Sequence, residues 1–326
     1  MKVKQVRRRT ESVLRFYGVS DKDARITTDV LLTATLKGYH GHGIERLLPT
    51  IVGFEARALR PTAGDAPMFD GVFAKIDADS GLGPLAGVHA MELAIRKASF
   101  NSVGMTGVIN HGHLGSLGYY SELAAKAGHF GVVMCNSSPM VVVPGGSLPV
   151  FGTNPIAISF PLLGGGILTI DVSTAAISHS NLIAAKNRGD SLPVNVAVDS
   201  LGHMTQDPHA ARGILSHGGD MKGCLLSLAI SVMAGPLIGG RPNHEVTGSR
   251  NTKEAPTVSS SFLCFNIEAM GGLQYFLEAN QSLLQIMQES SPDFHIPGLA
   301  AASRLRESEK QDIPMSAELR ALLLKH

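Results

Sequence analysis

The sequence contains no tryptophan, few aromatic residues and only three cysteines. Cys135, Cys224 and Cys264 are far apart, odd in number and form no C-x-x-C pair. This spacing supports neither a disulfide framework nor a zinc site built from cysteines. An excess of charge is also missing, because 28 Lys and Arg residues face 27 Asp and Glu residues, for a net charge of +1. We therefore expect no binding to nucleic acid or to an anionic membrane surface.

Long hydrophobic runs are lacking as well. The first residues, 1–16, contain no apolar core of the kind found in signal peptides. The most apolar run, residues 224–239, is too short to span a bilayer comfortably and is interrupted by Ser227, Ser231 and Pro236. We expect this run to form a buried, central helix, and we expect a cytoplasmic protein with no membrane partner.

What the chain does have is length, apolar residues and glycine. Its 326 residues are 44% hydrophobic, which is enough for a large core. The 36 glycines gather in the middle third, where they indicate corners between strands and loops. Ser20, with Asp23 three residues later, has the pattern of a helix N-cap. Helix-like patterns at residues 85–98 and 117–127 alternate with strand-like runs at residues 105–109, 130–136, 156–161 and 167–173. This alternation predicts an α/β fold.

Two glycine-rich loops each carry a pair of histidines two residues apart. GYHGHGIERL (residues 38–47) contains His40 and His42, with Arg46 four residues later, and NHGHLG contains His111 and His113. Neutral imidazoles two apart on extended backbone could bind a divalent ion, which makes a metal-dependent hydrolase one alternative. Histidines that only satisfy hydrogen bonds of their own loops are a second alternative.

Acid–base chemistry is a third interpretation of the first loop. An imidazole with a pKa of about 6.5 can donate a proton at neutral pH. The planar guanidinium of Arg46 suits a substrate carboxylate, and an ion pair with Glu45 is its alternative role. A proton donor beside a carboxylate clamp is what reduction of a 2-oxo or 2-imino acid requires.

Two further residues follow or begin regular elements. Asp171 ends the strand-like run ILTID, so it can orient an imidazole or simply cap the next turn. Lys222 heads an apolar helical stretch, where it can bind an anion or lie along the surface as an ordinary lysine. The glycine run at residues 81–87, GLGPLAG, is one residue too long for a Rossmann fingerprint, and no P-loop is present. A bound dinucleotide would therefore not use a Rossmann turn.

Several motifs together resemble those of a known family. GYHGHGIERL resembles a segment S-H-G-[VI]-x-R, and NHGHLGSLGYY resembles N-H-F-G-x-x-G-Y-Y. GTNPIAISFP and DVSTA follow in the same order, so the resemblance covers nearly the whole chain. The family is that of the malate/L-lactate dehydrogenase-like oxidoreductases, which reduce 2-oxo or cyclic 2-imino acids with NADH or NADPH. The H-x-H-G segment and DVSTAAISH are most similar to the Δ1-piperideine-2-carboxylate/Δ1-pyrroline-2-carboxylate reductase branch.

The resemblance implies a fold and an assembly. The expected fold is α/β and non-Rossmann, with a central mixed-sheet domain and a helical domain built from the N- and C-terminal segments. Residues 1–80 would form the N-terminal helical segment with the His/Arg loop, and residues 81–240 the central cofactor-binding region. Residues 241–326 would form a polar loop and a C-terminal segment that returns to the helical domain. The expected partners are a small carboxylate substrate and a second copy of the chain in a homodimer.

The resemblance also implies roles for individual residues. His42 and Asp171 would be the catalytic acid–base pair, and no metal is expected. The substrate side would comprise Arg46 on the carboxylate together with His40, His113 and Thr153. The cofactor side would comprise Ser137, Asp171, Val172, Ser173, Thr174, Lys222 and Gly223.

The sequence departs from the family pattern at a few positions. Gly41 replaces the serine before His42, and residues 179–181 replace a glycine-containing turn. Asp220 and Met221 leave no histidine before Lys222. Ser231 stands where a glutamate is usual, and Leu299 replaces the acid of a P-G-E motif. These changes motivate one more alternative, a non-redox relative that binds or isomerises a small carboxylate.

Overall fold

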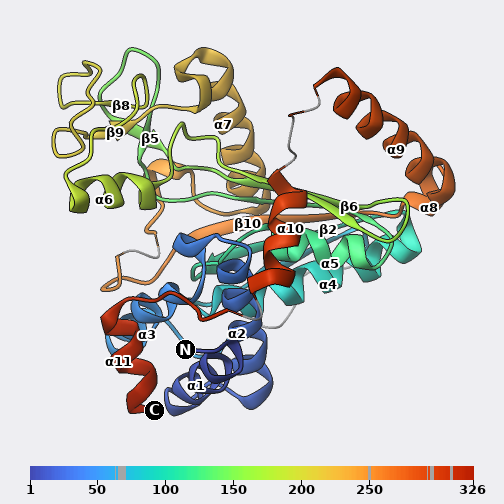
Figure 1. The fold of residues 1–326 in the computed structure, drawn as a ribbon, viewed down its shortest axis with the longest axis horizontal. Helices are drawn as coiled ribbons and strands as arrows, with labels where there is room; N and C mark the ends of the chain where they lie inside the picture. Colours follow the sequence, from blue (N-terminus) through green and yellow to red (C-terminus); the bar gives the residue numbers. More distant parts are fainter. Residues whose placement is uncertain (63, 65–70, 249–250, 292, 294–296, 309–310) are drawn as a thin grey trace.

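A six-stranded mixed sheet runs through the middle of the molecule (Figure 1). The computed structural model describes residues 1–62, 64, 71–248, 251–291, 293, 297–308 and 311–326. In sheet order the strands are β1 (Phe73–Asp77), β2 (Val103–His111), β10 (Val258–Phe265), β3 (Phe130–Cys135), β6 (Ile156–Pro161) and β7 (Ile167–Val172). β1 and β2 are parallel and the other neighbours are antiparallel. The predicted α/β class with a central mixed sheet is confirmed.

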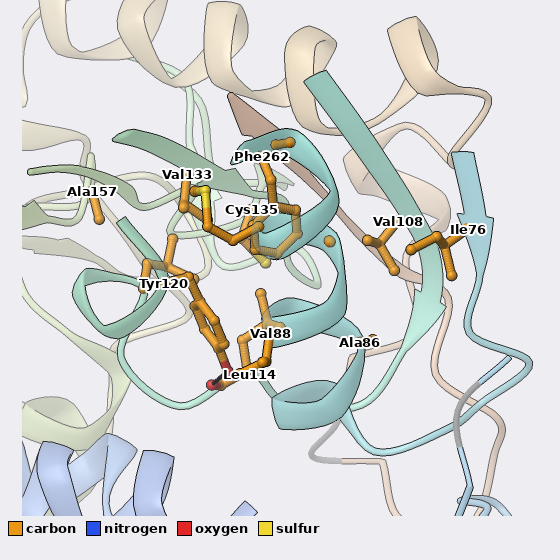
Figure 2. Close-up of a cluster of buried hydrophobic side chains, with 14 of the residues drawn as sticks. Ile76, Ala86, Val88, Val108, Leu114, Tyr120, Val133, Cys135, Ala157 and Phe262 are labelled. Carbon is orange, nitrogen blue, oxygen red and sulfur yellow. Dashed lines mark hydrogen bonds between the residues drawn. The ribbon is translucent and has the colours of Figure 1, made fainter. Parts of the chain in front are cut away.

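Two helices, α4 (Gly83–Asn101) and α5 (Gly118–Lys126), cover one face of this sheet (Figure 1). The core between them contains Tyr120 and Phe262, both fully buried, with ring centroids 5.8 Å apart in an edge-to-face arrangement. Figure 2 shows the Tyr120 side chain reaching Leu114, whose carbonyl accepts its hydroxyl proton. Because that hydroxyl is hydrogen-bonded, the large ring is buried without leaving an unsatisfied polar group.

A smaller sheet forms a second layer of structure at the upper left of Figure 1. Its order is β5 (Pro149–Phe151), β4 (Val141–Val142), β9 (Gly213–Ile214) and β8 (Ala197–Val198), and α6 (His179–Arg188) packs beside it. Leu182 and Ala185 of α6 share a buried cluster with Val141 and Ile214 of the sheet. This cluster fixes the position of the first turn of α6, which faces the candidate site.

The N- and C-terminal segments form one helical part. It contains α1 (Val3–Phe16), α2 (Asp21–Leu36), α3 (Leu47–Glu55) and α11 (Ala317–Lys325), and both termini lie at its lower end in Figure 1. Leu14 packs with Leu319 and Leu323 in a single core cluster. Ser20 caps α2 by accepting the amide proton of Asp23 at 3.2 Å, as its position before an amphipathic run predicts.

The remaining elements connect these parts. They are the short helices η1 (His40–His42), η2 (Ile44–Arg46), η3 (His217–Gly219), η4 (Pro236–Ile238) and η5 (Asn243–Glu245), and the helices α7 (Met221–Ala234), α8 (Ile267–Met270), α9 (Leu273–Ser290) and α10 (Pro297–Ser308). β1 lies within residues 1–80 and β10 within residues 241–326, yet both belong to the central sheet. Residues 249–250 of the polar stretch lie outside the described part of the chain.

The apolar helix α7 is not the buried central helix that its composition predicts. It packs on β3 and β10 through Ile230 and through small side chains such as Ser231 and Ala234. Its leucines point outward instead, with Leu225 54% and Leu228 43% exposed. By length and hydropathy alone, residues 221–238 would suit a membrane span, but only 39% of this window is buried. The prediction is wrong because hydropathy does not show which face of a helix contacts the sheet.

Helix α9 is a second element that leaves apolar residues uncovered. None of its residues is buried, and Tyr275, Leu283 and Ile286 are 73%, 55% and 59% exposed. In Figure 1 it extends away from the sheet at the upper right. A helix face with several exposed apolar side chains is typical of protein interfaces.

The contact between α4 and β2 depends on Gly104. A Cβ at this position would lie 2.0 Å from the carbonyl oxygen of Ala94 and 2.8 Å from the backbone nitrogen of Ala98. Because backbone atoms of a packed helix cannot move aside cheaply, we expect Gly104→Ala to lower the free energy of unfolding by about 1–3 kcal/mol or more. Urea unfolding measures this change. Gly166→Ala is the control, since its nearest neighbour is 3.6 Å away, and equal stability of both variants would contradict the packing argument.

Candidate active site

One cavity of about 200 Å³ lies where the helical part, the central sheet and the smaller sheet meet. Its walls come from η1, the loop after β2, the ends of β3 and β7 and the first turn of α6. The lining side chains are mainly histidines and hydroxyl groups, and they include Tyr39, His42, His113, Ser116, Ser137, Ser138, Thr153, Asp171, Ser173, Ser178, His179 and Ser180. Such a concave site with a few converging polar groups is the usual form of a small-molecule site.

The carboxylate of Asp171 is held rigidly at the end of β7. Its Oδ2 accepts the Ser116 hydroxyl proton at 2.6 Å and the Gly118 amide proton at 2.9 Å. Gly118 begins α5, so the carboxylate also satisfies one of the amides that a helix start leaves without an intrahelical partner. No described residue donates a hydrogen bond to Oδ1. Asp171 therefore has one fixed oxygen and one oxygen available to another group in the cavity.

The imidazoles of His42 and His113 lie near each other, although the two residues are 71 positions apart in the sequence. Their ring centroids are 5.6 Å apart, and the rings are inclined by 37°. Nδ1 of His113 accepts the Gly115 amide proton at 2.9 Å. In the neutral ring this hydrogen bond places the proton on Nε2, which makes Nε2 a donor. Both rings line the cavity that Asp171 lines.

The loop that carries His42 is anchored on both sides. Thr35 of α2 accepts the Ile44 amide proton at 2.8 Å. Glu45 accepts hydrogen bonds from the amide and the hydroxyl of Ser316, at 2.6 and 2.8 Å, and so joins the loop to the C-terminal segment. These contacts restrain a glycine-rich segment that would otherwise be flexible.

His111 differs from His113 although the two share a loop. It is fully buried, its Nδ1 lies 2.7 Å from the Gly112 carbonyl oxygen, and its Nε2 lies 2.8 Å from the Ser260 hydroxyl. Burial lowers the pKa of His111 to about 4, and the hydrogen bond to Gly112 offsets only part of this shift. The ring is therefore neutral at physiological pH, and it serves as a structural donor and acceptor.

His40 and Arg46 do not line this cavity. His40 lies on a separate groove with Glu45, Pro314 and Met315. Arg46 lines a narrow pocket that it shares with His113, so it adjoins the main cavity behind that ring. The expectation that His40 and His42 converge is wrong, because η1 is a 3₁₀ helix, in which residues two apart point in different directions.

The convergence of two H-x-H pairs on a metal is not found either. Among the residues that the structure describes, no group of three or more His, Cys, Asp or Glu side chains could hold a metal ion. The separation of His40 from His42 and the burial of His111 explain why. The metal-dependent hydrolase has no site in this part of the chain.

The expected cofactor-side residues divide into two groups. Ser137, Asp171 and Ser173 line the cavity. Thr153, which is expected on the substrate side, joins two of them, because Ser137 Oγ accepts the Thr153 amide proton at 3.0 Å and Ser173 donates to the Thr153 carbonyl at 3.0 Å. The other expected cofactor-side residues do not line the cavity. Val172 is half-exposed, and Thr174 is buried and donates its hydroxyl proton to the Thr153 and Asn154 carbonyls. Lys222 and Gly223 lie at the start of α7.

The start of α7 is capped by the chain itself. Asp220 accepts the Gly223 amide proton at 3.1 Å, so one of the two residues between Gly219 and Lys222 is a helix N-cap. Lys222 follows it on the exposed side of the helix. Leu299 is 39% exposed on α10, while Ile296, the start of the IPGL motif, lies outside the described residues.

Sequence patterns did not single out several residues of the cavity. Tyr39 is half-buried, and burial, followed by the nearby charge of Asp171, raises the pKa of its hydroxyl. Ser116 fixes Asp171, and Ser180 lies at the start of α6. Tyr39 and Ser116 stand within the two histidine motifs, which is the one signal that could have found them.

Comparison with known proteins assigns the chain to a class and then to a family. The class is that of the oxidoreductases, as its relatives are dehydrogenases and reductases. The family model described as malate/L-lactate dehydrogenase matches residues 1–323, and the chain belongs to this family. The predicted family and the predicted enzyme class are confirmed.

Relatives of two kinds are similar over most of the chain. The malate/(S)-sulfolactate dehydrogenase of Methanothermus fervidus is 32% identical over 312 residues, which are 94% of this chain and 91% of the relative. The Δ1-pyrroline-2-carboxylate/Δ1-piperideine-2-carboxylate reductase of Pseudomonas syringae pv. tomato is 29% identical over 274 residues, 82% of this chain and 79% of the relative. The solved structure of sulfolactate dehydrogenase from Methanocaldococcus jannaschii superposes with a TM-score of 0.93, at 32% identity, covering 100% of this chain and 95% of that one.

The buried His111 predicts how stability depends on pH. Below about pH 6.5 the unfolded chain binds a proton at this position, whereas the folded chain binds it only near pH 4. Stability conferred by the neutral ring is therefore lost as the pH falls through this window. Between pH 7 and pH 5 we expect the free energy of unfolding of the wild type to fall by about 2 kcal/mol because of this residue. The variant His111→Gln should lack this decrease, and urea unfolding at the two pH values measures it. The control is His209→Gln at an exposed histidine, in which the free energy of unfolding should depend on pH as it does in the wild type. The same pH dependence in His111→Gln would contradict the conclusion that the buried His111 ring is neutral.

Proposed function

We propose that this chain reduces C2 of a small 2-oxo acid or cyclic 2-imino acid, such as Δ1-pyrroline-2-carboxylate or Δ1-piperideine-2-carboxylate, with NADH or NADPH. The observation that carries the proposal is that His42, His113 and Asp171 line one cavity of a size suited to a small acid. The relatives are named for malate, sulfolactate and cyclic imino carboxylates, which all carry a carboxylate beside the reacting carbon.

His42 is the proton donor in this proposal. His42 lines the cavity, and its ring lies 5.6 Å from the ring of His113. Asp171 lines the same cavity, and its Oδ1 is available to a protonated imidazole. Such a carboxylate stabilises the charged ring and fixes its orientation, as it does in other catalytic pairs.

The substrate carboxylate is bound on the side of His113. Arg46 reaches the pocket that His113 shares, and its guanidinium suits a carboxylate through two parallel hydrogen bonds. Nε2 of His113 adds a donor, since its Nδ1 is occupied by Gly115. Thr153 lines the same cavity as His113.

The wall formed by Ser137, Ser138 and Thr153 fits a nicotinamide group. Gly152 and Gly248 let backbone lie close to it, because a Cβ at these positions would be 2.2 Å from Ser137 Oγ and 2.6 Å from Ser138 Oγ. NADH or NADPH would supply the hydride that C2 receives. Lys222, exposed at the start of α7, is the proposed cation for the phosphate groups of the cofactor.

A homodimer is part of the same proposal. The uncovered apolar faces of α7 and α9 are of the kind that a second copy of the chain would bury. Phe276 and Tyr275 of α9 also line an apolar groove with Phe130, so the helix and the groove at its base form one continuous surface. An interface there would account for leucines that face outward.

Exchange of single histidines tests the reaction. A panel of 2-oxo acids, with and without ammonia or methylamine, and of cyclic imines should show a substrate that consumes NADH or NADPH. With that substrate we expect His42→Asn to lower kcat by about 10²–10⁴-fold, the usual contribution of a general acid. His40→Asn is the matched control and should keep wild-type kcat, because its side chain lies on another groove.

Two outcomes would contradict this account. Full turnover in a folded His42→Asn variant would remove the proton donor. Absence of NADH and NADPH binding by fluorescence titration would favour the non-redox relative that binds a small carboxylate.

The dimer proposal has its own test. We expect Leu283→Glu together with Ile286→Glu to convert the dimer to a monomer, because both side chains are more than half exposed on the apolar face of α9. Light scattering after size-exclusion chromatography measures the mass. Gln285→Glu on the same helix adds charge to an already polar position and should leave the mass unchanged. A double variant that stays dimeric would place the interface elsewhere.

A further inference from the structure

The first turn of α6 lies directly against the loop that carries His42. Its N-cap, Ser178, accepts the Asn181 amide proton at 3.1 Å, which fixes the start of the helix. A Cβ on Gly41 would lie 2.6 Å from Oγ and 3.0 Å from Cβ of Ser180. The side chain of Ser180 thus fills the space that any side chain at position 41 would need.

The hydroxyl of Ser180 is available to a ligand. Ser180 lines the cavity together with His42 and Asp171. It forms no hydrogen bond with a described residue, whereas the neighbouring hydroxyls of Ser116 and Ser173 are both used within the protein. A half-buried hydroxyl without a protein partner, beside the proposed proton donor, is suited to bind an oxygen atom of a small acid.

We propose that Ser180 is a substrate-binding residue and that Gly41 and Ser180 act as a pair, in which α6 supplies the hydroxyl that residue 41 lacks. The ligand class is the small carboxylated acid of the proposed function, on which this inference rests. The pair also makes α6 part of the substrate site, although α6 belongs to the smaller sheet and the proton donor to the helical part.

Loss of the hydroxyl should weaken substrate binding without slowing the chemical step. We expect Ser180→Ala to raise KM by about three- to tenfold, the effect of one hydrogen bond, with kcat almost unchanged. Ser180→Thr keeps a hydroxyl and should recover most of the wild-type KM. Asn187→Ala, on an exposed position of the same helix, is the control and should match the wild type.

The pairing with Gly41 gives a second, independent readout. Gly41→Ser alone should lower the thermal midpoint and raise KM, because its Cβ would overlap Ser180. Gly41→Ser with Ser180→Gly removes the overlap and should recover both values, so the two changes are not additive. An unchanged KM in Ser180→Ala, or additive effects in the double variant, would overturn the inference.

A binding experiment separates failure of the proposed reductase activity from failure of the proposed role of Ser180. If the wild-type chain turns over no acid, calorimetry with pyrrole-2-carboxylate, a stable planar analogue of a cyclic imino acid, replaces the kinetic assay. Weaker binding to Ser180→Ala than to the wild type supports the role of Ser180 as a ligand contact. Equal binding to both, or no binding to the wild type, overturns it.

Discussion

The hydrogen bonds of the Asp171 carboxylate hold three parts of the candidate site together. Through Oδ2 the carboxylate joins the end of β7 to Ser116 in the histidine loop and to the first amide of α5. Glycine at position 118 allows this close contact, because a Cβ there would lie 2.9 Å from Thr169 Cγ2 and 3.2 Å from Asp171 Oδ2. The position of the acid relative to the imidazoles therefore depends on the packing of β7 against α5, and not on the loops alone.

The contact between β7 and α5 also contains a buried polar network. Glu122 of α5 forms an ion pair with Lys37 at the end of α2, in which both side chains are largely buried, and it accepts the Thr169 hydroxyl proton at 2.7 Å. Thr169 in turn accepts the Ser159 hydroxyl proton at 3.0 Å. A buried ion pair is stabilising only where such hydrogen bonds satisfy its remaining oxygens. Here the network connects the helix that precedes His42 to the strand that carries Asp171.

Local periodicity was sufficient to predict much of the fold, and less of the site. The strands around residues 105–109, 130–136, 156–161 and 167–173 and the helix cap at Ser20 follow from short-range patterns. The orientation of α7 does not follow from such patterns, because its leucines face outward although they are its most numerous apolar residues. His40 and His42 separate because the backbone turns between them. Ser180 comes near Gly41 only through tertiary packing of α6, which no pattern within either segment indicates.

The central claim is that one small acid binds between His42 and His113, with Asp171 beside it. A crystal structure of the chain with pyrrole-2-carboxylate tests it most directly. The account predicts the ligand within hydrogen-bond distance of the His42 imidazole, with its carboxylate on the side of His113 and Arg46. A ligand in the groove beside His40 and Met315, or on the apolar surface of α9, would contradict it.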